Sequence, residues 1–287
     1  MSLFHLHRRS HTHQHGGATR RPGASVLEVT GLGVRYGERQ ALRDVSFAVG
    51  SGELVAVVGP NGAGKSTMFK AICGLVNHEG IVEVNDVHCH DRTDRMDLAY
   101  IPQRSDHDLG FPITVLELVL AGRRRFRHWW QSPSADDRAA ALDALRRVRL
   151  PDVADRALTE LSGGQLQRAY LARALAQQAS VVLLDEALSG VDQPTTEDLL
   201  DLFRVLAAEG TTLLVATHDL ALARRRFDRC LAVNGTLRAD GVPDDVLSLD
   251  VLDTVFGSAA APVAPSPGSP LAPSPTATTE PPGALDH

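Results

Sequence analysis

Residues 59–66, GPNGAGKS, form a glycine-rich loop that directly follows the apolar run Leu54–Val58. They satisfy the pattern G-x-x-x-x-G-K-[ST], in which glycines allow backbone N–H groups to curl around a phosphate group. A helix is expected over residues 64–75, and its N-terminus would point at the same anion. The loop therefore predicts a phosphate-binding site between a buried strand and a helix.

Two side chains of this loop have expected roles in holding a nucleotide. Lys65 can reach the β- and γ-phosphates, and the Ser66 hydroxyl is placed to bind Mg²⁺. The predicted phosphate-binding residues of the loop are Gly59, Asn61, Gly62, Gly64, Lys65, Ser66 and Thr67.

The rest of the chain alternates strand-like and helical segments. Helix, strand, helix and strand are expected in turn at 163–177, 181–185, 195–208 and 211–217. Alternation of this kind indicates parallel strands joined by crossover helices. Further strands are expected at 26–30, 45–49, 53–58, 81–84 and 99–102, and two helices of an insertion at 114–121 and 135–148. The sequence thus predicts an α/β core with a helical insertion and some antiparallel strands at its start.

Two local signals predict a turn between strands and the start of a helix. Asn234-Gly235 lies between apolar runs, which is typical of a β-hairpin with a type I′ turn. Ser134, followed by Asp136 and Asp137, is expected to cap the second helix of the insertion.

The predicted strand Val181–Asp185 ends in two adjacent acids, Asp185 and Glu186. In α/β folds, ligands bind at the carboxyl ends of the strands. Asp185 is expected to hold Mg²⁺, usually through water, and Glu186 to polarise an attacking water as a general base.

Residues 161–168, LSGGQLQR, lie between the glycine-rich loop and this acidic pair. With them, the chain resembles the nucleotide-binding subunits of ATP-binding-cassette (ABC) transporters over residues 25–256. The resemblance implies an α/β fold of the P-loop ABC type, with an antiparallel β subdomain and a helical subdomain. It also implies an ATPase that uses ATP and Mg²⁺ and pairs with a second ATPase subunit, in the simplest case a second copy of itself. In the family, the residues that correspond to Ser162, Gly163, Gly164 and Gln165 serve the nucleotide held by the other subunit.

Further positions match that family one at a time. Tyr36 resembles the aromatic residue that stacks on adenine, and Gln103 resembles the glutamine that senses Mg²⁺ and the attacking water. His218 resembles the switch histidine that contacts the γ-phosphate and braces the catalytic acid. Residues 189–192, SGVD, resemble the loop that crosses the dimer interface. The family usually has proline after the catalytic acid, where this chain has Ala187, and a modest effect on turnover is expected.

Residues 106–123, DHDLGFPITVLELVLAGR, resemble a segment of the ATPase subunits of manganese, zinc and iron-chelate importers. In those importers this neighbourhood receives the coupling helix of the permease. A simpler interpretation is a helix N-terminus in which Thr114 and Glu117 form a capping box, and the two are compatible. The resemblance implies a separate polytopic membrane permease, an extracytoplasmic solute-binding protein as an indirect partner, and zinc or manganese as the cargo.

The two ends of the chain differ from the middle. Five of the 12 histidines lie in the first fifteen residues, and eight of the 16 prolines lie between residues 262 and 282. We therefore expect a disordered His-rich head at 1–24, an ABC ATPase domain at 25–256 and a disordered tail rich in Pro, Ala and Ser at 257–287. The histidines of the head are expected either to bind Zn²⁺ or Ni²⁺ weakly or to have no role.

The composition disfavours several classes of function. No apolar run is long enough to cross a bilayer, and the start lacks the features of a secretory signal. The 3 cysteines are scattered, which indicates a reducing compartment, and the net charge of −6 argues against a nucleic-acid partner. Together with a permease partner, this places the expected location at the cytoplasmic face of the cell membrane.

Two alternatives keep the fold and change the function. One is an ABC subunit for haem, a siderophore or an exported solute. The other is a soluble ABC ATPase of DNA repair or translation, a class that typically carries two cassettes, coiled coils or basic extensions.

Three clusters of charged or metal-binding residues are expected to have no special role. The basic runs 123–127 and 224–229 are expected to be solvated helix faces. Residues 88–91, HCHD, are not expected to form one metal site, because alternate residues of a strand face opposite sides.

Overall fold

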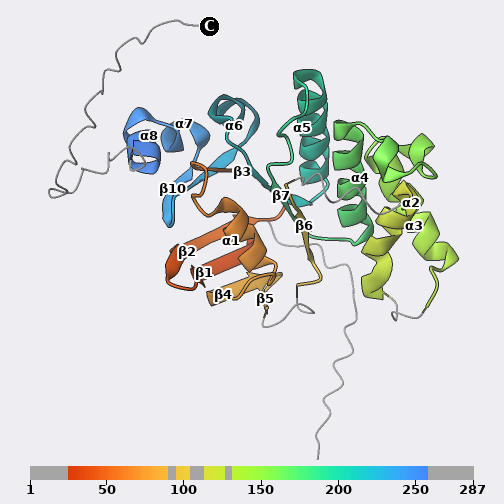
Figure 1. Cartoon of the computed structure of the whole chain (residues 1–287), viewed down its shortest axis with the longest axis horizontal. Coiled ribbons are helices and arrows are strands. Elements are labelled where there is room, and N and C mark those ends of the chain that lie inside the picture. The colour runs from red at the N-terminus through yellow and green to blue at the C-terminus, as the bar shows by residue number, and fades with distance from the viewer. Residues whose placement is uncertain (1–24, 90–94, 104–112, 127–130, 258–287) are drawn as a thin grey trace, which may run out of the picture.

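The computed structural model describes residues 25–89, 95–103, 113–126 and 131–257. Several predicted features lie outside these ranges: the His-rich head at 1–24, the tail from residue 258, His90 and Asp91, and residues 106–112. Within the described ranges, the chain forms two sheets with helices around them (Figure 1).

The first sheet is antiparallel, with strand order β2-β1-β4-β5. Its strands are β1 (Ser25–Tyr36), β2 (Arg39–Gly50), β4 (Glu79–Val84) and β5 (Val87–His88). Buried apolar residues lie on one face of β1 and β2, in register across the hairpin, as in the pair Leu27 and Val49. The predicted strands 26–30 and 45–49 are correct but short, because each is part of a 12-residue strand.

The second sheet has strand order β10-β9-β3-β8-β7-β6. Its strands are β3 (Leu54–Val58), β6 (Leu98–Ile101), β7 (Val181–Asp185), β8 (Thr212–Ala216), β9 (Arg229–Val233) and β10 (Leu237–Gly241). All neighbours are parallel except β9 and β10. Every residue of β3, β7 and β8 is buried, as expected for parallel strands that are covered on both faces.

The hairpin between β9 and β10 is confirmed, but the expected type I′ turn is wrong. That turn needs positive φ at both central residues, and here Gly235 has φ 67 while Asn234 is not among the residues with positive φ. Asn234 N instead donates to Thr236 O at 2.9 Å, and Asn234 Nδ2 donates to the Val255 carbonyl at 2.7 Å.

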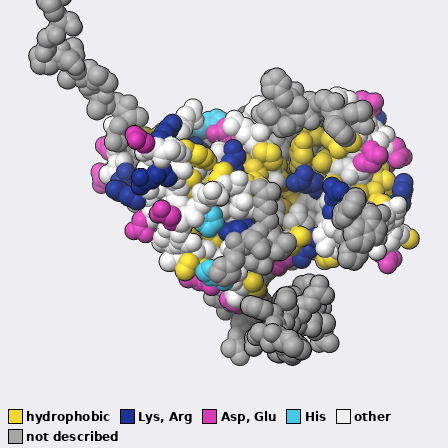
Figure 2. Space-filling model, turned by 60° about the horizontal axis from the view of Figure 1, so that its bottom comes forward, with side chains coloured by type: hydrophobic (Ala, Val, Ile, Leu, Met, Phe, Trp, Pro, Cys, Tyr) yellow, Lys and Arg dark blue, Asp and Glu magenta, His cyan; other side chains and the backbone are white. Residues whose placement is uncertain are grey.

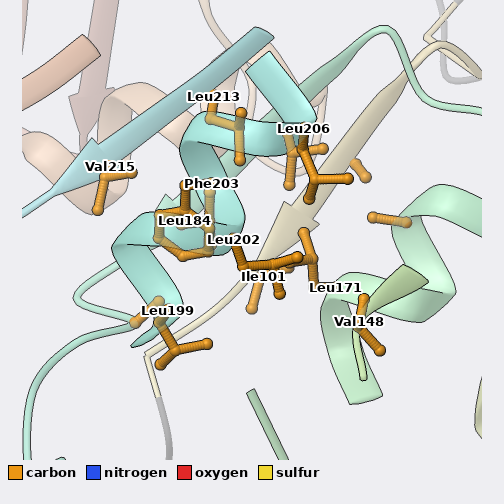
Figure 3. Close-up of a cluster of buried hydrophobic side chains, with 14 of the residues drawn as sticks. Ile101, Val148, Leu171, Leu184, Leu199, Leu202, Phe203, Leu206, Leu213 and Val215 are labelled. Carbon is orange, nitrogen blue, oxygen red and sulfur yellow. The ribbon is translucent and has the colours of Figure 1, made fainter. Parts of the chain in front are cut away.

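Helix α1 (Lys65–Ile72) lies between the two sheets. Its buried residues Met68, Phe69 and Ile72 share one apolar cluster with β1, β2 and β4 and with one face of the parallel sheet. The other face of the parallel sheet is covered by α4 (Gly163–Ala176), α5 (Gln193–Ala208) and α6 (Leu220–Arg226). Figure 3 shows this second cluster, in which Leu202 and Phe203 of α5 lie among residues of the strands and of α4.

The helical insertion forms a layer at one end of the molecule (Figure 1). It contains α2 (Val115–Ala121), η2 (Gly122–Phe126), α3 (Ala135–Arg147) and the short turns η3 (Pro151–Val153) and η4 (Leu158–Glu160), packed against α4. Both predicted caps are confirmed: Thr114 with Glu117, and Ser134 with Asp137, form complete capping boxes. At the opposite end, α7 (Pro243–Val246) and α8 (Leu249–Phe256) lie beside β10.

The basic run at 123–127 is not a solvated helix face within its described part, which corrects the expectation. Arg123 and Arg125 are each 12% exposed, and they form ion pairs with Asp137 and Asp97. In the second run, Arg226 is likewise largely buried and pairs with Glu197 and Asp201. These arginines are shielded by packing and by acids that are distant in the sequence, and the sequence alone gives no sign of those partners.

Asp97, just before β6, joins three parts of the fold. Its Oδ1 accepts from Arg125 Nη2 of the helical layer at 2.8 Å. Its Oδ2 accepts from Asn85 Nδ2, in the turn between β4 and β5, at 2.7 Å. Its backbone carbonyl accepts from Ser180 N and Val181 N, at the start of β7. The helical layer, the antiparallel sheet and the parallel sheet therefore meet at one residue.

On the face drawn in Figure 2, Lys and Arg side chains lie among acidic and apolar ones. Among the described residues, no helix is both long and apolar enough to cross a lipid bilayer. His88 is the last residue of β5, and Cys89, which follows the strand, is buried.

Candidate active site

The glycine-rich loop connects the end of β3 to the start of α1. Gly64 is the residue before the helix and has φ 99, a conformation that residues with a side chain rarely adopt. At Gly59, an added Cβ would lie 2.1 Å from the Val233 carbonyl oxygen, so the loop also passes close to β9. These two glycines explain why the loop can turn its backbone N–H groups toward one point.

Lys65 is buried at the start of α1, and its ammonium group is held by the loop itself. Its Nζ donates to the Gly59 carbonyl at 2.8 Å and to the Pro60 carbonyl at 3.2 Å. Burial lowers the pKa of Lys65, while the nearby carboxylates of Glu186 and Asp185 act in the opposite direction. The cation therefore lies between the glycine loop and the acidic pair.

Asp185 is the last residue of β7 and is only 2% exposed, yet both of its carboxylate oxygens accept a hydrogen bond. Ser66 Oγ donates to Oδ1 at 3.0 Å, and the Tyr100 hydroxyl donates to Oδ2 at 3.0 Å. Burial, the charge of Asp185 and this hydrogen bond raise the pKa of the Tyr100 phenol, so the phenol keeps its proton and acts as the donor. Tyr100 was not among the predicted site residues, because nothing in the strand pattern shows which acid its hydroxyl reaches.

Glu186 follows directly after β7 and has φ 48, in the left-handed region. This conformation is uncommon for a residue other than glycine, and such positions cluster at functional sites. Gln103, which follows β6, donates from Nε2 to Glu186 Oε2 at 2.7 Å. The two residues meet because β6 and β7 are parallel neighbours that end at the same edge of the sheet.

Most of the predicted nucleotide-binding residues line a single cavity of about 470 Å³. Tyr36 lies at this cavity with 48% of its surface exposed, which leaves an aromatic face available. Arg39 and Ala41 of β2 also line it and were missed, because the long hairpin that carries them past Tyr36 was not predicted. The predicted residues in the lining are Tyr36, Asn61, Gly62, Gly64, Lys65, Ser66, Thr67, Gln103 and Glu186.

His218 is absent from the lining of this first cavity. It lines a second cavity, of about 440 Å³, together with Ser189, Gly190 and Val191. Asp192, the last residue of the SGVD segment, caps α5 by accepting from Thr195 N at 3.0 Å, and this backbone hydrogen bond lowers the pKa of its carboxyl group. The second cavity therefore brings together His218 and the segment that resembles an interface loop.

Residues 162–165 are at the N-terminus of α4 and are absent from the linings of both cavities described. Ser162 Oγ accepts from Gln165 N at 3.3 Å, and Gln165 Oε1 accepts from Ser162 N at 3.0 Å, which completes a capping box. An added Cβ at Gly164 would lie 2.2 Å from Thr195 Cγ2, so α4 begins in close contact with α5. The side chains of Ser162 and Gln165 are thus used in capping the helix. The N-terminus of α4 is the part of the motif that can still bind an anion.

The family model described as ABC transporter matches residues 42–189, which is more than half of the chain. The chain belongs to the ABC transporter family. It is an ATP-binding subunit with ATPase activity, and the expected fold of the ABC type is confirmed.

Two curated ABC relatives are similar over most of their length. The manganese transport system ATP-binding protein MntA of Synechocystis sp. is 39% identical over 233 residues, which are 80% of this chain and 90% of the relative. The zinc transport system ATP-binding protein TroB of Treponema pallidum is 37% identical over 237 residues, 82% of this chain and 88% of the relative.

Among solved structures, a metal-chelate-type ABC transporter in an inward-facing conformation is similar to this ABC subunit. The two share a TM-score of 0.72 and 28% sequence identity, over 82% of this chain and 90% of that one.

Proposed function

We propose that this ABC subunit hydrolyses ATP to energise the transport of a transition-metal ion, manganese or zinc, through a separate membrane permease. The observation that carries the hydrolytic role is the contact of Gln103 with Glu186 at the rim of the cavity formed by the glycine loop. The names of the relatives, which are manganese and zinc transport ATP-binding proteins, support the cargo.

Within the first cavity, the residues have complementary roles. Tyr36 stacks on the adenine, and the loop residues from Asn61 to Thr67 hold the phosphates with their backbone N–H groups. Lys65 releases its contacts with the Gly59 and Pro60 carbonyls and turns its ammonium group to the β- and γ-phosphates. Glu186 accepts a proton from the attacking water, which Gln103 helps to orient.

The residues present fit Mg²⁺. The Ser66 hydroxyl and the Asp185 carboxylate offer oxygen atoms 3.0 Å apart, and Mg²⁺ prefers oxygen ligands. Gln103 would offer its amide oxygen as a further ligand, after its side chain leaves Glu186. Bound there with ATP, Mg²⁺ neutralises negative charge on the phosphate oxygens.

A second ATPase subunit, in the simplest case a copy of this chain, completes the site. Ser162 to Gln165 are outside the cavity of their own chain, yet they start a 14-residue helix whose N–H groups favour an anion. In a head-to-tail dimer they would contact the nucleotide of the partner. Residues 189–192 would line the interface, and His218 would reach the γ-phosphate and brace Glu186 there.

The remaining partners follow from the transport role. The permease spans the membrane, so this subunit would associate peripherally with its cytoplasmic face. An extracytoplasmic solute-binding protein would deliver the ion to the permease and contact this subunit only indirectly.

The proposal is tested with Glu186→Gln, which keeps the size of the side chain and removes the base. Phosphate release by the purified permease complex with Mg²⁺ and ATP should fall about 10²–10⁴-fold, while ATP still binds. Cells that lack this chain should lose manganese or zinc accumulation, and the wild-type chain, but not the variant, should restore it. Normal metal accumulation in cells without the chain would refute the cargo, and unchanged phosphate release would refute the role of Glu186.

A further inference from the structure

The phenol of Tyr100 links β6, the strand that precedes Gln103, to the buried acid of the phosphate site. Tyr100 is on β6, where it pairs with Leu183 of the parallel neighbour β7. Its ring therefore lies along β7 toward Asp185, two residues further on, and its hydroxyl donates to Asp185 Oδ2 at 3.0 Å.

This contact fixes the orientation of the Asp185 carboxylate. With Oδ2 held by Tyr100, the other oxygen, Oδ1, faces Ser66 Oγ at 3.0 Å. Rotation of the carboxylate about its last bond would break both hydrogen bonds, and Asp185 is too buried for water to replace them readily. The two hydroxyls thus fix the plane of the Asp185 carboxylate, with one of its oxygens beside Ser66.

We propose that Tyr100 is a positioning residue for ATP hydrolysis, which holds Asp185 so that Oδ1 and Ser66 Oγ together present a preformed pair of oxygen ligands. The inference rests on the proposed role of Ser66 and Asp185 in binding Mg²⁺, and it adds a group that touches neither the nucleotide nor the metal ion. Tyr100 of β6 and Gln103, two residues after the end of β6, thus orient the two members of the acidic pair.

The alternative is that Tyr100 only packs against the apolar cluster around α1, where its ring lies. Tyr100→Phe distinguishes the two, because it keeps the ring and removes the one oxygen atom. Tyr170→Phe on α4, away from the linings of the two cavities, is the matched control for the loss of a tyrosine hydroxyl.

The test measures divalent-ion binding apart from activity. Mn²⁺ is titrated into the full-length protein saturated with ADP and followed by electron paramagnetic resonance, and ADP affinity is measured separately in EDTA. Tyr100→Phe should raise the Kd for Mn²⁺ about 3- to 10-fold, the effect of one lost hydrogen bond, and leave ADP affinity in EDTA within about twofold. An unchanged Kd for Mn²⁺ would overturn the inference.

Asp185→Asn separates this inference from the proposed function. If that variant leaves Mn²⁺ binding unchanged, the assignment of Asp185 as a metal ligand is wrong and both fail. If Asp185→Asn weakens Mn²⁺ binding and Tyr100→Phe does not, only the role of Tyr100 fails. In the double variant, Tyr100→Phe should add no further weakening, because it acts through Asp185, and additive effects would contradict that route.

Discussion

Gln103 Nε2 lies 2.7 Å from Glu186 Oε2, so a residue after β6 holds the carboxylate that follows β7. The two are far apart in sequence and meet because their strands are parallel neighbours. Glu186 adopts a left-handed backbone conformation at this point, and the hydrogen bond fixes the side chain that this conformation directs to the cavity.

Replacing Gln103 should therefore impair hydrolysis more than binding. In Gln103→Ala, Glu186 loses its partner, and we expect the rate of phosphate release to fall about tenfold or more while ATP affinity in EDTA stays within about twofold. Steady-state phosphate release and equilibrium nucleotide binding provide the two measurements. A large loss of affinity in EDTA with an unchanged rate would contradict the assigned role.

The backbone of the glycine loop should tolerate no side chain at Gly64. Gly64→Ala combines φ 99 with a Cβ that would lie 2.6 Å from Leu42 Cδ2, and the conformation alone costs about 1–2 kcal/mol. We expect ATP affinity to fall about tenfold. Gly257→Ala, at φ −69 with open space around it, is the control that should change nothing. Equal affinities in the two variants would show that the loop geometry is not what binds the nucleotide.

Arg125 should matter for stability although it belongs to a run of basic residues. Its guanidinium donates to Asp97 and to the Met96 and Gln177 carbonyls, and its side chain is 12% exposed. Removing it takes the charged partner from Asp97 and a donor from each of the two carbonyls, although Gln177 Nε2 still donates to Met96 O, so Arg125→Ala should lower the free energy of unfolding by roughly 3 kcal/mol. Its neighbour Arg124 is exposed, and Arg124→Ala should change the value by less than about 0.5 kcal/mol in the same urea titration.

The thiols of the native protein should react slowly. Burial raises the pKa of Cys73 and of Cys230 to about 12, and Cys89 is buried as well. Since the thiolate is the reactive form, iodoacetamide at pH 8 should label these cysteines far more slowly in the native than in the unfolded protein. Mass spectrometry after timed quenching measures this, and rapid native labelling of Cys230 would contradict it.

The raised pKa values of Cys73 and Cys230 also predict how the stability of the protein changes with pH. A thiol whose pKa is higher in the folded than in the unfolded state favours folding while it is protonated in both states. Above pH 9 the unfolded chain releases its thiol protons first, so these two groups make the free energy of unfolding decrease between pH 9 and 12. Urea titrations across that range should show the decrease. Measured from its own free energy of unfolding at pH 8, Cys230→Ala should lose less stability than the wild-type protein.

Much of the parallel sheet and the phosphate loop could be predicted, because their signals are local. The strand Val181–Asp185 was predicted with its observed bounds, since four apolar residues before an acid fit a fully buried strand and little else. The caps at Thr114 and Ser134 were also predicted, because a capping box is encoded within four residues.

The parts of the fold and of the site that were not predicted depend on contacts between segments distant in the sequence. The β1–β2 hairpin was underestimated because exposed polar residues interrupt its apolar pattern, and this hid Arg39 from the site. The hydroxyl of Tyr100 and the guanidinium of Arg125 find their partners only after β6, β7 and η2 come together. His218 was assigned by its likeness to a family motif, and its place in the second cavity reflects a loop geometry that a motif does not encode.

The three-way contact at Asp97 has a consequence for the proposed coupling of this subunit to a permease. A permease that pushes on the helical layer would act on Arg125, and the displacement would pass through the carboxylate of Asp97 to the turn at Asn85 and through its backbone carbonyl to the start of β7. Asp97 directly precedes β6, which continues to Tyr100 and then to Gln103. The residue that contacts the helical layer and the residues that contact Asp185 and Glu186 are therefore joined by one short strand. A displacement of the helical layer by the permease would thus be passed along β6 to Asp185 and Glu186.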